Sequence, residues 1–486
     1  MASTSSTTGG FEYAPAPESR SIVDIKPSYG LFVDGDFVDG QGSSFKTINP
    51  ATEETLAEVA EASEADVDLA VRAARRAFRG WSRMSGRERA KYLFRIARII
   101  QERGRELAVL ESIDNGKPIK ESRDVDVPIV AAHFFYYAGW ADKLEYAGLG
   151  ANPRPLGVAG QVIPWNFPLL MLAWKVAPAL ACGNTVVLKP AETTPLTALL
   201  FAEICQQADL PPGVVNIVTG AGATGQAIVA HPDVDKVAFT GSTEVGKAIA
   251  RTVAGSDKRV TLELGGKAAN IVFDDAPIDQ AVEGIVSGIF FNQGHVCCAG
   301  SRLLVQESVA DEVLARLKRR MGTLRVGDPL DKNTDIGAIN SSEQLARIRE
   351  LSDVGEAEGA ERWAPACDLP SSGFWFPPTV FTGVTQAHRI AREEVFGPVL
   401  SVLTFRTPAE AVEKANNTPY GLSAGVWTEK GSRILHMASQ LRAGVVWANT
   451  FNKFDPASPF GGFKESGYGR EGGRQGLAAY LQGGDL

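Results

Sequence analysis

The stretch that decides the fold is KVAFTGSTEVG, residues 236–246. Its first five residues form a short, mostly apolar run of the kind that is typical of buried strands. The strand ends at the turn 241–246, and a helix follows to about Val253. A strand that passes through a turn directly into a helix is the repeating unit of a parallel sheet with helices on both faces.

The same strand–turn–helix pattern repeats on both sides of this stretch. The predicted flanking strands cover residues 157–163, 185–188, 214–218 and 259–267. Parallel sheets of this kind bind ligands at the carboxyl ends of their strands. The polar side chains that fall at such ends are Asn166, Lys189, Glu192 and Ser242. The sequence therefore predicts an α/β fold with a ligand site along one edge of the sheet.

The N-terminal part of the chain is predicted to be scaffold. Residues 1–27 are rich in Ser, Thr, Pro and Gly and indicate a loosely draped arm. Residues 29–38 indicate a hairpin that turns at Asp34 and Gly35. A capping box at Ser63 predicts the start of one helix, and residues 86–109 predict another.

Length and charge exclude several classes of function. The chain has 486 residues, with 49 basic and 57 acidic side chains and a net charge of −8. This length predicts two or three domains. The negative charge argues against nucleic acid or an anionic membrane as a main partner. No apolar run reaches the length of a membrane span, and the first twenty residues fit neither a secretory signal nor a transit peptide, so a cytoplasmic location is expected.

Two adjacent cysteines, Cys297 and Cys298, lie in the stretch 290–302, just before a predicted strand. The five cysteines of the chain have no metal-ligand spacing and form no disulfide framework, so no metal site is expected. A thiol in this position is either a small buried hydrophobe or a nucleophile. The residues alone leave both interpretations open.

Two other polar residues stand in apolar surroundings. Glu263 lies in an otherwise apolar strand, where burial would raise its pKa toward the range of a general base. Asn166 lies between Trp165 and Phe167, where its amide could donate to a developing oxyanion. Nucleophile, oxyanion donor and base are the set that acyl transfer requires, although sequence alone does not show that they meet in space.

A nucleotide site is indicated less specifically. The turn 241–246 carries only half of the dinucleotide-binding fingerprint, so a purely structural turn is as good an interpretation. Glu192 could hold the hydroxyl pair of a ribose, with Lys189 beside it. A single carboxylate is usually a solvated surface group, but a Lys and a Glu together at a strand end favour a binding role.

From about Tyr29 to Tyr480 the chain resembles the NAD(P)-dependent aldehyde dehydrogenase superfamily. The resemblance rests on seven motifs in the order of that family: PWNFP (164–168), KPAE (189–192), FTGSTEVG (239–246), LELGGK (262–267), the stretch 290–302, EVFGP (394–398) and PFGG (459–462). It implies a Rossmann-type cofactor domain over residues 28–142 and 155–262 and an α/β catalytic domain over 263–458. The segments 143–154 and 475–486 would form a reduced oligomerisation module.

The resemblance also implies a role for each motif residue. Cys297 takes the position of the nucleophile, Glu263 that of the general base and Asn166 that of the oxyanion donor, whereas Cys298 takes the next, non-nucleophilic position. The aldehyde would be oxidised through a thioester on Cys297, with hydride transfer to NAD. The residues implied to contact the cofactor are Ile163, Trp165, Lys189, Glu192, Gly222, Gly225, Ser242, Val245, Glu394 and Phe396.

An apolar, largely aromatic substrate tunnel is implied as well. Its expected lining residues are Phe167, Met171, Trp174, Phe291, Phe454 and Phe460, each of which could equally be plain core. They favour aromatic or medium-chain aliphatic aldehydes. Lys453 near the mouth could favour an acidic substrate, and His295 stays unassigned.

The chain departs from the family in its assembly segments. Only eleven residues, 144–154, stand between Lys143 and Pro155, and the end of the chain lacks a β-rich segment. A homodimer is therefore expected and the usual tetramer is disfavoured. The pattern resembles the first unit of the aldehyde dehydrogenase 16 subfamily, in which a second, degenerate unit follows.

Three alternatives stay open at this point. The thioester could be passed to coenzyme A, although Glu263 favours hydrolysis. NADP could replace NAD, because Glu192 would repel a 2′-phosphate whereas Lys189 could accept one. The chain could also be a catalytically idle scaffold, which the joint presence of Cys297, Glu263 and Asn166 disfavours.

Overall fold

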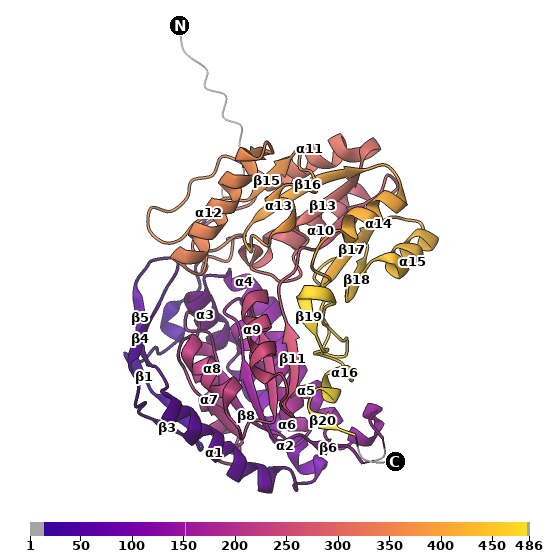
Figure 1. Ribbon diagram of the computed structural model, residues 1–486. Coiled ribbons are helices and arrows are strands. Elements are labelled where there is room, and N and C mark those ends of the chain that lie inside the picture. The colour runs from indigo at the N-terminus through magenta and orange to yellow at the C-terminus, as the bar shows by residue number, and fades with distance from the viewer. Residues whose placement is uncertain (1–13, 151, 484–486) are drawn as a thin grey trace.

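The computed structural model describes residues 14–150 and 152–483, which form two stacked α/β units (Figure 1). The lower unit contains an eight-stranded sheet in the order β19-β11-β10-β7-β8-β9-β2-β3. Its parallel centre is β11 (Arg259–Glu263), β10 (Lys236–Thr240), β7 (Val158–Val162), β8 (Thr185–Lys189) and β9 (Val215–Ile217). Its antiparallel margins are β19 (Gly467–Tyr468), β2 (Leu31–Val33) and β3 (Asp36–Val38).

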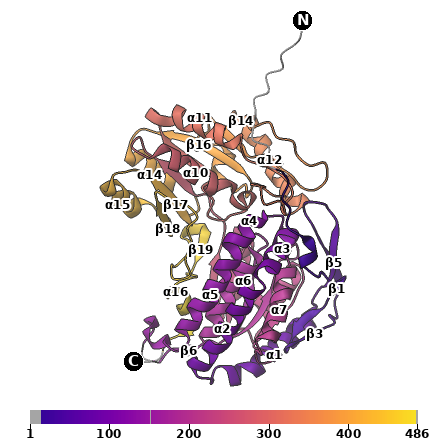
Figure 2. The same cartoon turned by 180° about the vertical axis from the view of Figure 1, so that it is seen from behind.

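Helices cover both faces of this sheet, as the strand–turn–helix pattern predicts. One face packs against α1 (Glu64–Trp81), α8 (Gly222–Ala230) and α9 (Thr243–Val253). The other face packs against α6 (Pro168–Ala181) and α7 (Leu196–Gln207), and α2 (Gly86–Glu102) and α5 (Val127–Trp140) pack on these helices, as Figure 2 shows from behind. Strands β7, β8 and β10 are buried along their whole length, because both of their faces are covered.

The upper unit contains a seven-stranded sheet in the order β14-β15-β16-β13-β12-β17-β18. Its strands are β14 (Glu361–Trp363), β15 (Thr379–Thr382), β16 (Val399–Phe405), β13 (Arg302–Gln306), β12 (Ala269–Val272), β17 (Ser423–Trp427) and β18 (Val445–Ala448). Only β14 pairs antiparallel. The helices around this sheet include α10 (Ile278–Phe290), α11 (Ala310–Met321), α12 (Ser342–Ala357), α14 (Pro408–Asn416) and α15 (Gly431–Gln440).

Several local predictions are confirmed and one is wrong. The hairpin β2–β3 turns at Asp34 and Gly35, which both have positive φ angles. The Ser63 capping box is present at the start of α1. The predicted helix 86–109 is instead two helices, α2 and α3 (Gly104–Asn115), because the chain leaves helical geometry at Arg103 and Gly104 starts the second helix.

Two peripheral segments complete the fold. In the predicted assembly segments, β6 (Arg154–Pro155) and β20 (Leu481–Gln482) form a two-stranded sheet of two residues each. Of the arm, residues 1–13 lie outside the described residues. Its described part contacts both units: Glu18 pairs with Arg105 of α3 and with Lys332, and its N–H donates to the Leu330 carbonyl at 2.8 Å. Within 14–150 and 152–483, no helix is both long and apolar enough to cross a membrane.

Candidate active site

A cavity of about 680 Å³ is lined by side chains from both units. From the eight-stranded sheet come residues that follow β7, β10 and β11; from the other unit come the turn before β13 and the segment after β15. The predicted site residues that line it are Trp165, Asn166, Phe167, Met171, Trp174, Ser242, Glu263, Phe291, Cys297, Glu394, Phe396, Phe454 and Phe460. The structure therefore brings the thiol, the amide and the carboxylate to one cavity.

Cys297 is held at the end of a sharp kink that follows α10. Asn292 and Gln293 have positive φ angles of 47° and 53°, and the backbone N–H of Asn292 donates to the buried Glu121 carboxyl at 2.8 Å. The Cys297 side chain is half-buried, whereas Cys298 is 1% exposed. The neighbouring Cys298 thiol and burial hold the pKa of Cys297 well above its usual range. Of the two sulfurs, Cys297 is the more accessible from the cavity.

The amide of Asn166 is fixed by the same kink. Its Nδ2 donates to the His295 backbone carbonyl at 2.8 Å, and the backbone carbonyl of Asn166 accepts Asn292 Nδ2 at 2.6 Å. A side-chain amide has two N–H donors, so one donor of Asn166 remains for a ligand in the cavity. The loop that carries the thiol thus also orients the expected oxyanion donor.

Glu263 ends strand β11 and is 4% exposed, and no hydrogen bond to either carboxylate oxygen is present among the described residues. Burial raises the pKa of Glu263 well above its usual range, and the nearby Glu471 raises it further. Lys175 opposes this effect and lowers the pKa. A carboxyl with a raised pKa in contact with the cavity has the protonation behaviour that a general base needs.

Lys175 and Glu471 were missed by the sequence predictions. Lys175 Nζ donates to both Glu471 oxygens at 2.6 and 2.8 Å and to Thr240 Oγ1 at 2.6 Å. Both side chains are buried. One signal was available: Lys175 is the only charged residue in helix α6, whose other thirteen positions are apolar or Pro. A charge in such a helix must find a buried partner.

Two glycines allow the strand carrying Glu263 to approach the rest of the site. A Cβ atom on Gly265 would lie 2.3 Å from Glu394 Oε2, and one on Gly266 would lie 2.3 Å from the Cys297 carbonyl oxygen. The Gly266 N–H also donates to Glu394 Oε1 at 3.0 Å. Burial raises the pKa of Glu394 to about 7. A larger residue at Gly265 would therefore displace the Glu394 carboxylate, and one at Gly266 would displace the backbone carbonyl of Cys297.

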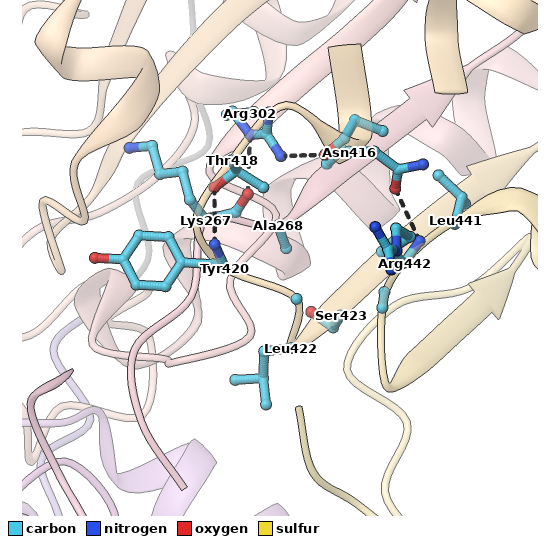
Figure 3. A pocket seen from close by; sticks show the side chains of 15 residues that line it. Lys267, Ala268, Arg302, Asn416, Thr418, Tyr420, Leu422, Ser423, Leu441 and Arg442 are labelled. Atoms are coloured by element: carbon cyan, nitrogen blue, oxygen red, sulfur yellow. Dashed lines mark hydrogen bonds between the residues drawn. The ribbon is translucent and has the colours of Figure 1, made fainter. Parts of the chain in front are cut away.

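The turn after Gly266 lies beside a second, smaller pocket at the amino ends of β12, β13, β17 and β18 (Figure 3). Arg302 donates to the carbonyls of Lys267, Lys414 and Ala415, each at 2.9 Å. The Arg302 guanidinium therefore donates only to backbone carbonyls among the described residues, and two of these lie near the end of α14. Lys267 Nζ is buried without a partner among the described residues, and burial lowers its pKa to about 7.

The residues that the resemblance assigns to the cofactor form two groups. Trp165, Ser242, Glu394 and Phe396 line the cavity, and Ser242 caps α9 by accepting Val245 N–H at 3.3 Å. Phe396 has a φ of 54°, and Gln344 Nε2 donates to its carbonyl at 2.8 Å. The exposed amides at the start of α9 suit a phosphate.

The second group surrounds Lys189, outside that cavity lining. Lys189 Nζ donates to the carbonyls of Gly220 at 2.6 Å and Pro190 at 2.8 Å and reaches the Glu192 carboxylate at 3.4 Å. Gly225 packs against the Lys189 side chain, and Gly222 begins α8. Ile163 lies buried below, and its N–H donates to the Lys189 carbonyl at 3.1 Å. Val245, in contrast, is 47% exposed on α9. A strand-end Lys and Glu beside a helix N-terminus fit the adenosine end of a dinucleotide.

The expected tunnel residues lie together. Trp174 packs against Phe460 with ring centroids 5.3 Å apart, and Phe454 packs against Phe460 at 5.8 Å. Lys453 is exposed and does not line the cavity. His295 does not line it either: its ring stacks on Phe396 and meets Trp165 edge-on, and burial lowers its pKa to about 3. A neutral His295 behind Phe396 has a packing role.

Comparison with known proteins gives one consistent family. A family model described as "Aldehyde dehydrogenase family" matches residues 37–483. Human retinal dehydrogenase 2 is 47% identical over 466 residues, which covers 93% of this chain and 90% of that protein. The mitochondrial aldehyde dehydrogenase family 2 member B4 of Arabidopsis thaliana is 47% identical over 465 residues, covering 93% and 86%. The structure of an aldehyde dehydrogenase from Bacillus cereus with NAD+ superimposes with a TM-score of 0.91 at 44% identity, covering 94% of this chain and 96% of that one.

Proposed function

This chain belongs to the aldehyde dehydrogenase family and oxidises an aldehyde with NAD, and we propose that Cys297, Glu263 and Asn166 carry out the chemistry. The observation that carries this proposal is the meeting of the three side chains at one cavity, although they come from distant parts of the chain. They supply the nucleophile, the base and the oxyanion donor that acyl transfer requires.

The proposed reaction uses these groups in sequence. The Cys297 thiolate attacks the aldehyde carbon and forms a thiohemiacetal. Its oxyanion accepts hydrogen bonds from the remaining Asn166 N–H and from the Cys297 backbone N–H. Trp165, Ser242, Glu394 and Phe396 would hold NAD, which would supply the acceptor for the hydride from this carbon, and a thioester on Cys297 would then remain. Glu263 then takes a proton from a water that attacks the thioester, which releases the carboxylic acid and the Cys297 thiolate and leaves the proton on Glu263.

The residues expected to contact the cofactor favour NAD over NADP. Glu192, which is about half exposed at the end of the Lys189 segment, would bind a 2′,3′-hydroxyl pair and repel a 2′-phosphate. Lys189 already donates to three oxygens, so it has no donor left for an added phosphate in this arrangement. At the other end, Glu394 and Phe396 would hold the nicotinamide riboside.

The substrate class follows from the wall of the cavity. The six tunnel side chains are aromatic apart from Met171, so an aromatic or medium-chain aliphatic aldehyde would bury apolar surface there. Trp174 Nε1 is buried without a hydrogen-bond partner among the described residues.

A panel of aldehydes, run separately with NAD and NADP, tests the function. Formation of NADH with aromatic or medium-chain aldehydes is expected, and its absence across the panel would favour an idle scaffold. Cys297→Ala is expected to abolish turnover, whereas Cys298→Ala should retain it. The opposite result would show that Cys298, and not Cys297, is the nucleophile. Asn166→Ala removes one oxyanion donor and is expected to cost about 10²–10³ in kcat.

The assembly and the location complete the proposal. The internal segment between α5 and β7 is short, and its described residues contribute a single-turn 3₁₀ helix, Leu144–Ala147, and the two-residue strand β6, which supports a homodimer over a tetramer. Light scattering that gives the mass of a tetramer would contradict this. All five cysteines are free, which agrees with a reducing, cytoplasmic location.

A further inference from the structure

Glu61 has no role in the reaction described above, yet its carboxylate is held firmly. It lies between β5 (Thr55–Ala60) and α1 and is half-buried. One oxygen accepts the Ser43 hydroxyl at 2.6 Å, and the other accepts the backbone N–H of Ala221 at 3.3 Å. These hydrogen bonds lower the pKa of Glu61, so the side chain carries a negative charge at neutral pH.

The contacts of Glu61 place this charge beside Lys189, within the second group of expected cofactor residues (the Lys189 group). The Gly220 carbonyl accepts Lys189 Nζ at 2.6 Å, and the very next amide, that of Ala221, donates to Glu61. A Cβ on Gly220 would lie 3.3 Å from Glu61 Cγ. Burial lowers the pKa of Lys189, while the charges of Glu192 and then Glu61 oppose that lowering. Two carboxylates therefore flank a single ammonium group.

The start of helix α8 is part of the same group. Helix α8 begins at Gly222, directly after the amide that Glu61 holds. The positive end of a helix dipole would otherwise attract a phosphate. A fixed carboxylate beside this end counteracts the attraction, and the Lys189 donors are already used.

We propose that Glu61 is a second determinant of cofactor choice: with Glu192 it disfavours a 2′-phosphate on the adenosine ribose, and so favours NAD over NADP. The inference rests on the proposed function, because that function assigns the adenosine ribose to the Lys189 group. Glu61 acts through its charge, at a strand-to-helix connection far in sequence from the motifs that carry the resemblance.

The test is a binding measurement that needs no turnover. Isothermal titration calorimetry would compare adenosine 2′,5′-bisphosphate with 5′-AMP on the wild-type protein, Glu61→Gln, Glu192→Gln and the double variant. The glutamine at 61 can still accept the Ala221 N–H, so only the charge is removed. The matched control is Glu58→Gln: Glu58 is an exposed residue of β5 that likewise accepts a serine hydroxyl, that of Ser44.

Glu61→Gln is expected to raise the affinity for the bisphosphate relative to 5′-AMP by about 5- to 20-fold at low ionic strength, and by much less in about 0.5 M salt. The double variant should exceed either single variant, and Glu58→Gln should not change the ratio. A ratio within twofold of wild type for Glu61→Gln, or a gain that salt does not weaken, would overturn the inference. Absence of NADH formation by the wild-type protein would instead count against the proposed function, and the calorimetric ratio would still decide the role of Glu61.

Discussion

The buried pair of Lys175 and Glu471 offers a sharp test of how the electrostatics of the site work. Glu471→Gln removes the charge that, after burial, does most to raise the pKa of Glu263, and leaves Lys175, which lowers it. The pKa of Glu263 should therefore fall, and the acid limb of the pH–rate profile of thioester hydrolysis should move to lower pH. Lys175→Met should move the limb the other way.

The order of four proteins follows from the relative size of the two effects. Glu471 acts on the pKa of Glu263 more strongly than Lys175 does. The acid limb should therefore lie at the highest pH in Lys175→Met, then in wild type, then in the variant that carries both changes, and at the lowest pH in Glu471→Gln. Hydrolysis of a nitrophenyl ester, which forms an acyl group on Cys297 without the cofactor, would follow this step in single turnovers.

The same variants differ in stability. Lys175 is fully buried and in Glu471→Gln it loses its opposite charge and one of its two acceptor oxygens, and an unpaired buried charge costs about 3–5 kcal/mol. The doubly changed protein should recover most of this loss in urea unfolding, because no charge is left unpaired. Glu465→Gln, in an exposed pair with Lys247, serves as the control and should change neither property. An acid limb in Glu471→Gln at or above the wild-type position would refute the reasoning.

Three further outcomes are expected. Cys298→Ala should make Cys297 react faster with iodoacetamide at pH 8, because the Cys298 thiol is the first cause of the raised pKa of Cys297; an unchanged rate would contradict this. Gly266→Ala places a Cβ against the Cys297 carbonyl, so kcat should fall at least tenfold in a folded protein, as circular dichroism and kinetics would show. Asn292→Ala removes the 2.6 Å hydrogen bond to the Asn166 carbonyl and should lower kcat by about 2- to 10-fold with little change in KM; a change in KM alone would argue against a positioning role.

The sequence predicts those parts of the fold that local patterns determine. The strands β7, β8 and β10 lie within a residue or two of their predicted bounds, because each is a short apolar run that ends at a turn. The helix break at Arg103 was not predicted, since apolar residues continue on both sides of it. There the direction of the second helix depends on tertiary packing.

The site could be predicted only where its residues sit in motifs. Cys297, Glu263 and Asn166 each stand out locally, as an adjacent thiol pair, a charge in an apolar strand and an amide between aromatic residues. The pairing of Lys175 with Glu471 joins residues 296 positions apart, and that of Glu61 with Ala221 joins residues 160 apart. No local pattern encodes such contacts, because only the folded sheets bring them together.

The N-terminal arm has a consequence for the way the chain is made. Glu18 meets Arg105 early in synthesis, but the contacts of Glu18 and its neighbours with residues 330–333 can form only after more than three hundred further residues have been synthesised. During translation, the eight-stranded unit has to begin folding without this contact. The arm therefore docks late, when residues 330–333 have become available. A nascent chain stalled before residue 330 should keep the arm sensitive to protease.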